Sequence, residues 1–483
     1  MRTIGIPNVC GIKIETLPTG FKMTAVRAAV PEMVLLDGLV GLYAYDELQR
    51  GAHGFLIGPT QTRDFVSLMR DWAAGNEEDM AVHYTRLLPG MLTSMPTLDA
   101  YIQLQKEKLC QLKIHCRCPL PDPSPGARRT AARWLERTKH SNEEGPTMNA
   151  LRWTAINEMD WEDAADMGAH PSGWVQVDTL MVGICGSEIA AYLGHNELRR
   201  PPLVMGHEFS ARLTVDLPTQ NLVAGDLVTV NPLVSCGRCR ACLSGNRQRC
   251  LDRKIIGIDF SGGFAERVFV PERQCYKVNE ATHGALVEPL ACAIRAVNQG
   301  AVEKGDEVVV IGAGIIGLMS ALGAKAQGAR KVAIIDPNAR RLRDGLSWGA
   351  TDLIEANDEE VLTEVSKLMP DGADRVIDAV GFGTTRTHSL QMVRRGGRVV
   401  WIGLHENLSS IPGNAVVRDE TEIVGSFCYT DDEFRRAVDL ANMGFTKRPG
   451  AWLDVRPVVA GKVAFAEQAR GPAPFAKILL AFD

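Results

Sequence analysis

The N-terminal part of the chain alternates short apolar runs with amphipathic stretches. The apolar runs predict buried strands at Asn8–Lys13, Met33–Asp37 and Gly54–Gly58. Positions with helical spacing follow at Thr62–Ala74 and Asp79–Leu92. Strands that alternate with helices predict parallel β/α units. Three such units cannot close a barrel, which needs eight strands. Residues 1–139 are therefore expected to form a partial (β/α) barrel.

The pattern changes after a polar segment that contains Gly-Pro, which predicts a linker at 140–147. Residues 148–297 carry short apolar runs separated by turn residues. These runs predict strands at Trp174–Val177, at Leu180–Ile184, within Leu222–Val230 and after Gly262–Glu266. Several short strands at regular spacing favour a small, partly open β-barrel.

Residues 298–430 show the pattern of a doubly wound parallel sheet. The apolar run Glu307–Ile311 leads into a glycine-rich turn, a helix and a second run, Lys331–Ile335, which ends at Asp336. This context makes Gly-x-Gly-x-x-Gly a specific signal for a dinucleotide. The predicted cofactor-binding residues are Gly312, Gly314, Ile315, Ile316, Gly317, Asp336 and Arg341.

The residue after the second strand bears on the choice of cofactor. Asp336 should accept a hydrogen bond from the ribose 2′-OH and repel a 2′-phosphate, which favours NAD over NADP. Arg340 and Arg341 weaken this argument because they could attract that phosphate. The mainly α/β pattern continues with apolar runs at Arg375–Val380 and Arg398–Gly403.

Composition excludes several classes of function. The chain has 483 residues, a net charge of −5 and no basic tract, so nucleic-acid binding has no electrostatic support. No apolar run approaches the roughly 18 residues that span a bilayer, and the first twenty residues lack a signal-peptide pattern. A cytoplasmic protein is therefore expected.

Two metal signatures lie close together. Four cysteines at spacings of 2, 2 and 7 suit one tetrahedral structural Zn²⁺: Cys236, Cys239, Cys242 and Cys250. A second set, Cys185, His207 and Glu208, mixes ligand types and leaves a fourth position open, as catalytic zinc requires. Alone, Cys-x2-Cys could be a redox pair, and Cys185 or His207 could be a packed core residue. The remaining seven cysteines are expected to be free thiols.

Several motifs occur in the order found in one enzyme family. They are GICGSE (183–188), PPLVMGHEF (201–209), the four-cysteine loop, LVEPLACA (286–293) and VVVIGAGIIG (308–317). With them, residues 148–483 resemble the zinc-dependent medium-chain alcohol and polyol dehydrogenases. The resemblance implies a chaperonin-10-like (GroES-like) catalytic barrel completed by 431–483, a Rossmann domain, and a homodimer or homotetramer.

The resemblance also implies roles for individual residues. Ser187 would pass the alcohol proton towards the cofactor ribose, and the acidic ligand would be Glu208 or Glu288, which are both glutamate in polyol-type relatives. Glu288 could instead be a helix-start carboxylate before Pro289. Two departures from the family are Ala190, where many relatives have the next histidine of the relay, and Ala211, where a glycine is usual in the loop after Glu208. His195 is a less favoured substitute for that histidine.

Residues 1–139 resemble the C-terminal half of the dihydrodipicolinate synthase / N-acetylneuraminate lyase barrels. The matching segments are PNVCGIK (7–13) and RGAHGFLIGP (50–59), with Leu87-Leu-Pro89 and Arg117-Cys-Pro119 further on. In that family the lysine matching Lys13 forms a Schiff base with a keto acid. Because the first half-barrel is absent, we expect this region to be inactive and, with unpaired sheet edges, poorly stable.

Together these patterns predict an oxidoreductase that transfers a hydride from a secondary alcohol, a polyol or sugar derivative, to NAD. Two alternatives remain open at this level. One is a Schiff-base lyase or dehydratase acting through Lys13, and the other is a catalytically impaired fusion protein that only binds nucleotide.

Overall fold

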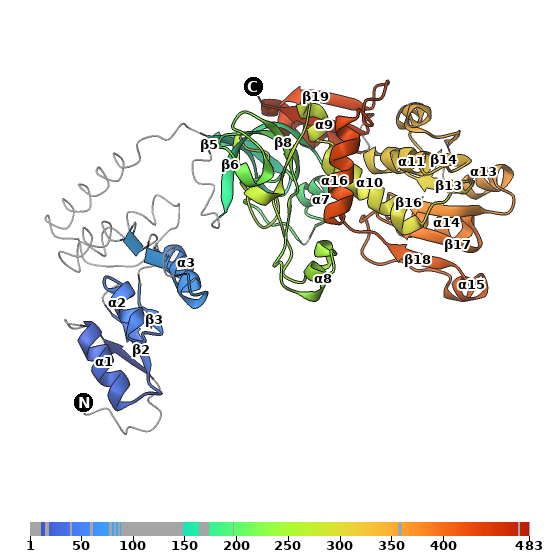
Figure 1. The fold of residues 1–483 in the computed structure, drawn as a ribbon. Helices are drawn as coiled ribbons and strands as arrows, with labels where there is room; N and C mark the ends of the chain where they lie inside the picture. The colour runs from blue at the N-terminus through green and yellow to red at the C-terminus, as the bar shows by residue number, and fades with distance from the viewer. Residues whose placement is uncertain are drawn as a thin grey trace. The chain divides into compact units, whose positions relative to one another are not determined.

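The computed structural model divides into two compact units, Met1–Gly145 and Pro146–Asp483 (Figure 1). The structure describes residues 11–14, 19–38, 41–57, 61–76, 80–81, 84–85, 87, 148–163, 173–196, 198–355, 360–471 and 474–482. Within these residues no helix is long and apolar enough to cross a membrane.

The N-terminal unit contains a small parallel sheet with strand order β1-β2-β3. Its core is formed by residues such as Met23, Leu35 and Leu68. The predicted alternation of strands and helices is present, although the third strand is shorter than Gly54–Gly58. The start of the first expected strand and most of the helix expected at Asp79–Leu92 lie outside the described residues. The elements are β1 (Gly11–Ile14), α1 (Thr19–Ala29), β2 (Val34–Asp37), α2 (Ala44–Gln49), β3 (Gly54–Phe55) and α3 (Thr62–Ala73).

This sheet does not by itself establish a barrel, and the partial-barrel assignment stays a prediction. Lys13 lies on β1 and is exposed. An amine that forms a Schiff base at neutral pH needs burial or a neighbouring cation to lower its pKa. The exposure of Lys13 therefore gives no support to the alternative of a lyase.

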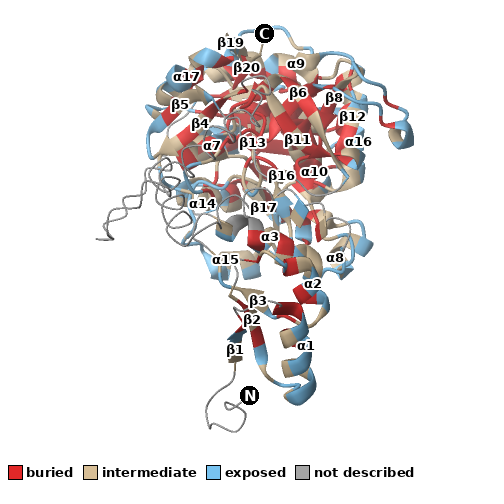
Figure 2. Cartoon of the chain, turned by 90° about the vertical axis from the view of Figure 1, so that its left-hand side faces the viewer, coloured by how far each residue is buried: buried red, intermediate tan, exposed pale blue. Residues whose placement is uncertain are grey.

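The catalytic part of the second unit is built on a seven-stranded sheet with the path β12-β8-β7-β6-β20-β19, and β11 also pairs with β6. Apolar side chains such as Phe209, Phe264 and Phe465 fill its interior, and buried residues concentrate along these strands (Figure 2). The strands are β6 (Trp174–Gly183), β7 (Glu208–Leu213), β8 (Leu227–Val230), β11 (Arg267–Pro271), β12 (Cys275–Lys277), β19 (Leu453–Pro457) and β20 (Lys477–Ala481).

Two details of this sheet differ from the predictions. The strands expected at Trp174–Val177 and Leu180–Ile184 form one continuous strand, β6, because β11 pairs with residues 174–178 and β7 continues the pairing over residues 177–183. Ala211 does not lie in a tight turn. It is buried in the middle of β7, opposite Thr179 of β6 and Val228 of β8, where alanine fits without backbone strain.

Smaller elements complete this part of the chain. Two antiparallel pairs lie outside the main sheet: β4 (Asn149–Ala155) with β5 (Glu158–Asp163), and β9 (Leu233–Val234) with β10 (Lys254–Ile255). The C-terminal strand β20 pairs antiparallel with β6, which places Leu479 opposite Gly183. The helices are α7 (Gly186–Tyr192), α8 (Arg240–Leu243), α9 (Ala281–Gly284) and α17 (Gly461–Ala469).

The dinucleotide-binding part is a six-stranded parallel sheet of order β15-β14-β13-β16-β17-β18, the doubly wound arrangement that the sequence predicts. Its strands are β13 (Glu307–Ile311), β14 (Lys331–Ile335), β15 (Asp352–Ile354), β16 (Ala373–Asp378), β17 (Val393–Trp401) and β18 (Glu422–Gly425). Its helices are α11 (Ile315–Ala326), α12 (Ala339–Leu342), α13 (Val361–Leu368), α14 (Gly383–Met392), α15 (Gly413–Arg418) and α16 (Asp431–Asn442).

Helix α10 (Val287–Gly300) runs without interruption from the catalytic part into the dinucleotide-binding part. It packs against α11 and α16, and most of its residues are buried. The division into domains at 297/298 and 430/431 stays a prediction.

Candidate catalytic metal site and dinucleotide site

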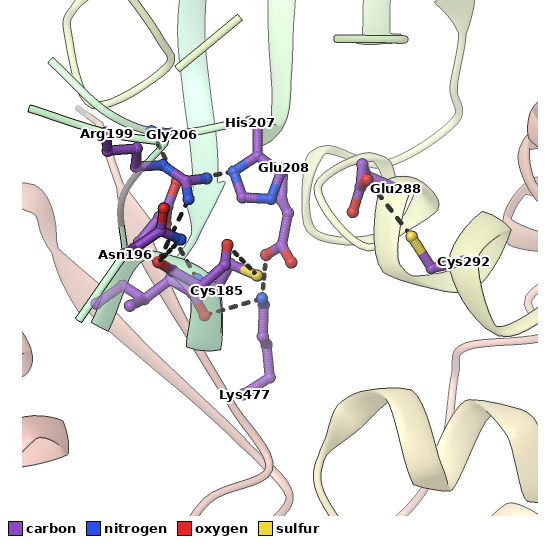
Figure 3. A network of polar contacts seen from close by, with 12 residues as sticks. Cys185, Asn196, Arg199, Gly206, His207, Glu208, Glu288, Cys292 and Lys477 are labelled. Carbon is purple, nitrogen blue, oxygen red and sulfur yellow. Dashed lines mark hydrogen bonds and ion pairs between the residues drawn. The ribbon is translucent and has the colours of Figure 1, made fainter. Parts of the chain in front are cut away.

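Cys185, His207 and Glu208 form one cluster although twenty-two positions separate the cysteine from the histidine. Cys185 follows β6 and precedes α7, whereas Glu208 is the first residue of β7, which pairs with β6 so that Gly183 lies opposite Glu208. One ligand atom from each of the three residues lies within 4.8 Å of the others (Figure 3). The thiol, imidazole and carboxylate suit a zinc ion that keeps one position open.

The backbone that leads into His207 requires glycine at position 206. Gly206 has φ +102°, in the left-handed region that other residues rarely adopt. A Cβ atom at Gly206 would lie 2.7 Å from the backbone nitrogen of Phe264. Gly206 therefore allows the chain to pass close to the neighbouring loop and to present His207 and Glu208 to Cys185.

The carboxylate of Glu188 hydrogen-bonds three groups of this site and so holds it in place. The carboxylate accepts hydrogen bonds from His207 Nδ1 at 2.8 Å, from Gly206 N at 2.9 Å and from Cys185 N at 3.1 Å. Burial opposes ionisation of Glu188, but His207 and Arg199 lower its pKa below the ordinary value. With Nδ1 bonded to Glu188, Nε2 is the nitrogen of His207 that can bind a metal.

Lys477 of β20 forms a buried ion pair with Glu208. Its Nζ also donates to the carbonyl oxygen of Ile184 at 2.9 Å. Burial would lower the pKa of Lys477, but the Glu208 carboxylate raises it, so the ammonium form is favoured. Gly183 makes room for the pair, because a Cβ there would lie 2.4 Å from Glu208 Oε2 and 2.6 Å from Lys477 Cε.

Glu288 approaches the cluster from a different element. It lies in the first turn of α10, on the opposite side of the site from Cys185 (Figure 3). Its Oε1 accepts a hydrogen bond from Cys292 Sγ at 3.6 Å, and Tyr429 lies close enough to the carboxyl to lower its pKa. Burial raises the pKa of Glu288. Glu208, and not Glu288, belongs to the group whose ligand atoms lie within 4.8 Å.

Ser187 lies beside the predicted metal ligands. Its Oγ donates to Cys185 Sγ at 3.3 Å, and its carbonyl oxygen accepts from Asn196 and Arg199. Ala190, on the same helix, has no group that could continue a proton relay. His195 is exposed on the loop after α7.

The four cysteines of the loop converge as a tetrahedral site requires. The Sγ–Sγ distances are 3.5 Å for Cys236–Cys250 and Cys239–Cys242 and 3.9 Å for Cys236–Cys242. With Zn–S bonds of about 2.3 Å, the edges of a tetrahedron are about 3.8 Å. Backbone N–H groups of Arg238 and Cys239 lower the pKa of Cys236 to about 6. The donor set therefore fits a closed zinc site.

The glycine-rich turn between β13 and α11 has the geometry of a dinucleotide site. Gly312 has φ +100°, and a Cβ at Gly317 would lie 1.8 Å from the carbonyl oxygen of Gly312. Ile315 and Ile316 begin α11, whose N-terminus favours a phosphate group. These glycines thus allow the helix to start close to the strand end.

The carboxylate of Asp336, directly after β14, closes this turn. It accepts hydrogen bonds from Ala313 N at 2.7 Å and from Asn338 N at 2.8 Å. Asp336 and Arg341 interact, and burial lowers the pKa of Arg341 while Asp336 raises it. An open hollow is lined by Pro337, Asn338, Ala339, Arg340 and Pro474.

Sequence reasoning did not identify four residues that support the site: Glu188, Lys477, Cys292 and Tyr429. A lysine within the apolar run Lys477–Ala481 was a signal, because a charge in a buried strand needs a partner. The partner itself, Glu208, lies too far away in the sequence to be inferred from a local pattern.

Known proteins show the same organisation. Residues 171–280 match the alcohol dehydrogenase GroES-like domain, and residues 316–443 match the zinc-binding dehydrogenase domain. The chain is 31% identical to L-idonate 5-dehydrogenase of Vitis vinifera, over 61% of this chain and 82% of that protein. It is also 31% identical to D-xylulose reductase A of Aspergillus oryzae, over 65% of this chain and 90% of that protein.

A solved structure has a similar fold. The zinc-binding dehydrogenase from Sinorhizobium meliloti, bound to NADP, matches with a TM-score of 0.62 and 27% identity over 70% of this chain and 99% of that one. The GroES-like and Rossmann architecture predicted from the sequence is thereby confirmed. The chain belongs to the zinc-dependent medium-chain alcohol and polyol dehydrogenases, oxidoreductases that act on CH–OH groups with a nicotinamide dinucleotide.

Proposed function

We propose that this dehydrogenase oxidises a secondary alcohol of a polyol or sugar derivative, with NAD as the hydride acceptor. The observation that carries the proposal is the cluster of Cys185, His207 and Glu208, with Glu288 facing it from α10. Buried carboxylates and a serine hydroxyl around one site suit a substrate with several hydroxyl groups. Two relatives of this chain bear the names of enzymes for L-idonate and D-xylulose, which supports the same substrate class.

Cys185, His207 and Glu208 would hold the catalytic zinc, and Cys236, Cys239, Cys242 and Cys250 the structural one. Zinc bound in the catalytic site supplies a Lewis acid that acidifies an alcohol hydroxyl. Glu188 fixes the imidazole of His207 so that Nε2 faces the site. Lys477 balances the charge of Glu208 and keeps its carboxylate oriented.

Ser187 is the group that would accept the hydroxyl proton and pass it on, because a hydroxyl donates and accepts at the same time. Ala190 cannot continue the relay, so the proton must leave Ser187 through solvent, the cofactor ribose or another side chain. His195 is one candidate, and its exposure lets it exchange protons with water.

NAD is the proposed cofactor because Asp336 stands where the 2′-position of the adenosine ribose is expected. The backbone N–H groups of Ala313 and Asn338 keep its carboxylate in place, so a 2′-phosphate would meet a fixed negative charge. Binding of phosphate by Arg340 would oppose this preference. We further propose a homo-oligomer in the cytoplasm, with a small-molecule alcohol as the substrate and neither nucleic acid nor membrane as a partner.

The test is NADH formation by the full chain on a panel of polyols, sugar acids and simple secondary alcohols, each with NAD and NADP. We expect turnover on hydroxyl-rich substrates, loss after zinc chelation and recovery when zinc is added back. Turnover that survives complete removal of zinc would contradict the role of the Cys185 cluster. NADH binding without turnover on any alcohol would favour the alternative of an impaired, nucleotide-binding fusion protein.

A further inference from the structure

The four-cysteine loop is bonded to the N-terminus of α16. Arg247, in the loop, donates from Nη1 to Asp431 Oδ2 at 2.9 Å and from Nε to Ser235 Oγ at 2.7 Å. The side chains of Arg247 and Asp431 are only 17% and 24% exposed. A pair this well covered is screened less by solvent than an ordinary surface ion pair. It therefore ties the loop to the first residue of α16.

A second arginine from the same region contacts the residues just before α16. The guanidinium of Arg253 lies over the ring of Phe427, 4.5 Å from its centroid. The other side of this helix start is fixed by a capping box, in which Thr430 Oγ1 accepts from Glu433 N and Glu433 Oε2 accepts from Thr430 N. Residues 427–431 are thus held by contacts from both directions.

The segment 427–431 has a strained backbone at its second residue. Cys428 has φ +47°, in the left-handed region that is unfavourable for a residue with a Cβ atom. Such a conformation persists only when the surroundings determine it. The contacts of Arg253, Arg247 and the capping box supply this constraint on either side of Cys428.

The next residue, Tyr429, connects this segment to the catalytic site. Its side chain is only 1% exposed and packs on Phe434 with a ring distance of 5.2 Å. Burial and the nearby charge of Glu288 raise the pKa of Tyr429 above its ordinary value, which places the hydroxyl close to that carboxyl. The helix that carries Glu288 is joined to α16 as well, because Arg295 Nη1 pairs with Glu433 Oε2 at 3.1 Å.

We propose that the four-cysteine loop is a positioning element for the catalytic site. Through Arg247 and Arg253 the loop fixes the segment 427–431. This segment places Tyr429 against Glu288. Tyr429 thereby orients the Glu288 carboxylate, which faces the cluster of Cys185, His207 and Glu208. The structural zinc would then contribute to turnover as well as to stability. For its kinetic consequence this inference rests on the proposed function.

Two variants break the same bond from opposite ends. Arg247→Gln removes the arginine of the loop, and Asp431→Asn removes its partner on α16 without changing the loop. Two matched controls lose the same charge nearby. Arg249 lies in the same turn as Arg247 and is exposed, and Asp432 follows Asp431 with a side chain that is 93% exposed. The controls are Arg249→Gln and Asp432→Asn.

Hydrogen exchange of the full zinc-loaded chain gives a measurement that does not depend on any substrate. We expect exchange of the amides in 427–430 to become faster in Arg247→Gln and in Asp431→Asn, and to stay unchanged in both controls. We also expect kcat to fall about 10-fold, the usual effect of losing a residue that orients an active-site group. The dissociation constant for NADH should not change, because the Gly312–Gly317 turn is not touched.

The double variant should lose no more than either single variant, since both remove one interaction. The proposal is overturned if Asp431→Asn behaves like Asp432→Asn in exchange and in kcat. It is also overturned if only Arg247→Gln has an effect and that variant loses the zinc of the loop. If the wild-type chain turns over no alcohol, the proposed function fails, and the exchange data still decide whether the loop holds the segment.

Discussion

Removing the charge of Lys477 should destabilise the catalytic sheet more than an ordinary lysine substitution would. The side chains of Lys477 and Glu208 are both 2% exposed and form a direct ion pair. In the variant Lys477→Met the aliphatic volume is kept, but the Glu208 carboxylate stays buried without its cation. Loss of one partner of a buried pair costs about 3–5 kcal/mol. The carbonyl oxygen of Ile184 loses a hydrogen bond as well.

The loss of stability caused by Lys477→Met should depend on whether zinc is bound. In the metal-free protein nothing replaces the lost charge, so we expect the full cost of about 3–5 kcal/mol. In the zinc-loaded protein a divalent cation beside Glu208 compensates for the missing ammonium, so the cost should be less than half of this value. The double variant Lys477→Met/Glu208→Gln should recover about 2 kcal/mol in the metal-free protein, because the two residues are coupled.

The assay is native-state hydrogen exchange of the amides in β6 and β20, which reports the free energy of opening of this sheet. Lys462→Met is the matched control. Lys462 pairs with Asp160 at 3.0 Å, but these side chains are 65% and 45% exposed, so Lys462→Met should change the free energy of opening very little. The reasoning is refuted if Lys477→Met costs no more than Lys462→Met in the metal-free protein, or if Glu208→Gln gives no recovery.

Three further predictions concern other parts of the chain. Gly317→Ala should weaken NADH binding at least about 10-fold in a fluorescence titration, because its Cβ would collide with the carbonyl oxygen of Gly312. Cys250→Ser should reduce the zinc content from two ions to one per chain in metal analysis, whereas Cys275→Ser, at a buried cysteine outside both clusters, should keep two. Burial raises the pKa of Glu47 from 4.5 to about 7. As the pH rises between these values, the unfolded chain releases this proton before the folded chain does, so the free energy of unfolding of the N-terminal unit should fall by about 3 kcal/mol. Glu47→Gln should abolish that loss. In pulse proteolysis the variant should be equally resistant at pH 5 and pH 8, whereas the wild type should be less resistant at pH 8.

The sequence was most informative where a site lies in one continuous stretch. The spacing of Cys236, Cys239, Cys242 and Cys250 requires only a short loop, and the structure brings their sulfur atoms together. The turn Gly312–Gly317 was likewise predictable, because strand, turn and helix are adjacent. Local geometry dominates such motifs, so a pattern of residue types is enough to identify them.

Contacts between distant segments could not be predicted in this way. Lys477 meets Glu208 only because β20 returns to pair with β6, and no local pattern specifies that register. The role of Glu188 was missed for a related reason. A glutamate on a short helix usually faces solvent, but here Glu188 is buried and its carboxylate bonds to His207, which is distant in the sequence. Ala211 was placed in a loop because glycine is usual at that position in the family that the chain resembles, whereas pairing with both β6 and β8 extends the strand through it.

The two carboxylates of the site show why the sequence could not decide between them. Glu208 is adjacent to His207, so its distance from the other ligands depends only on the pairing of β6 with β7. Glu288 comes from α10, which packs against α11 at the dinucleotide sheet and against α16. Its distance from Cys185 therefore depends on how the two parts of Pro146–Asp483 pack together. The position of Glu288 is therefore set by the packing of α10, whereas that of Glu208 is set by the pairing of β6 with β7.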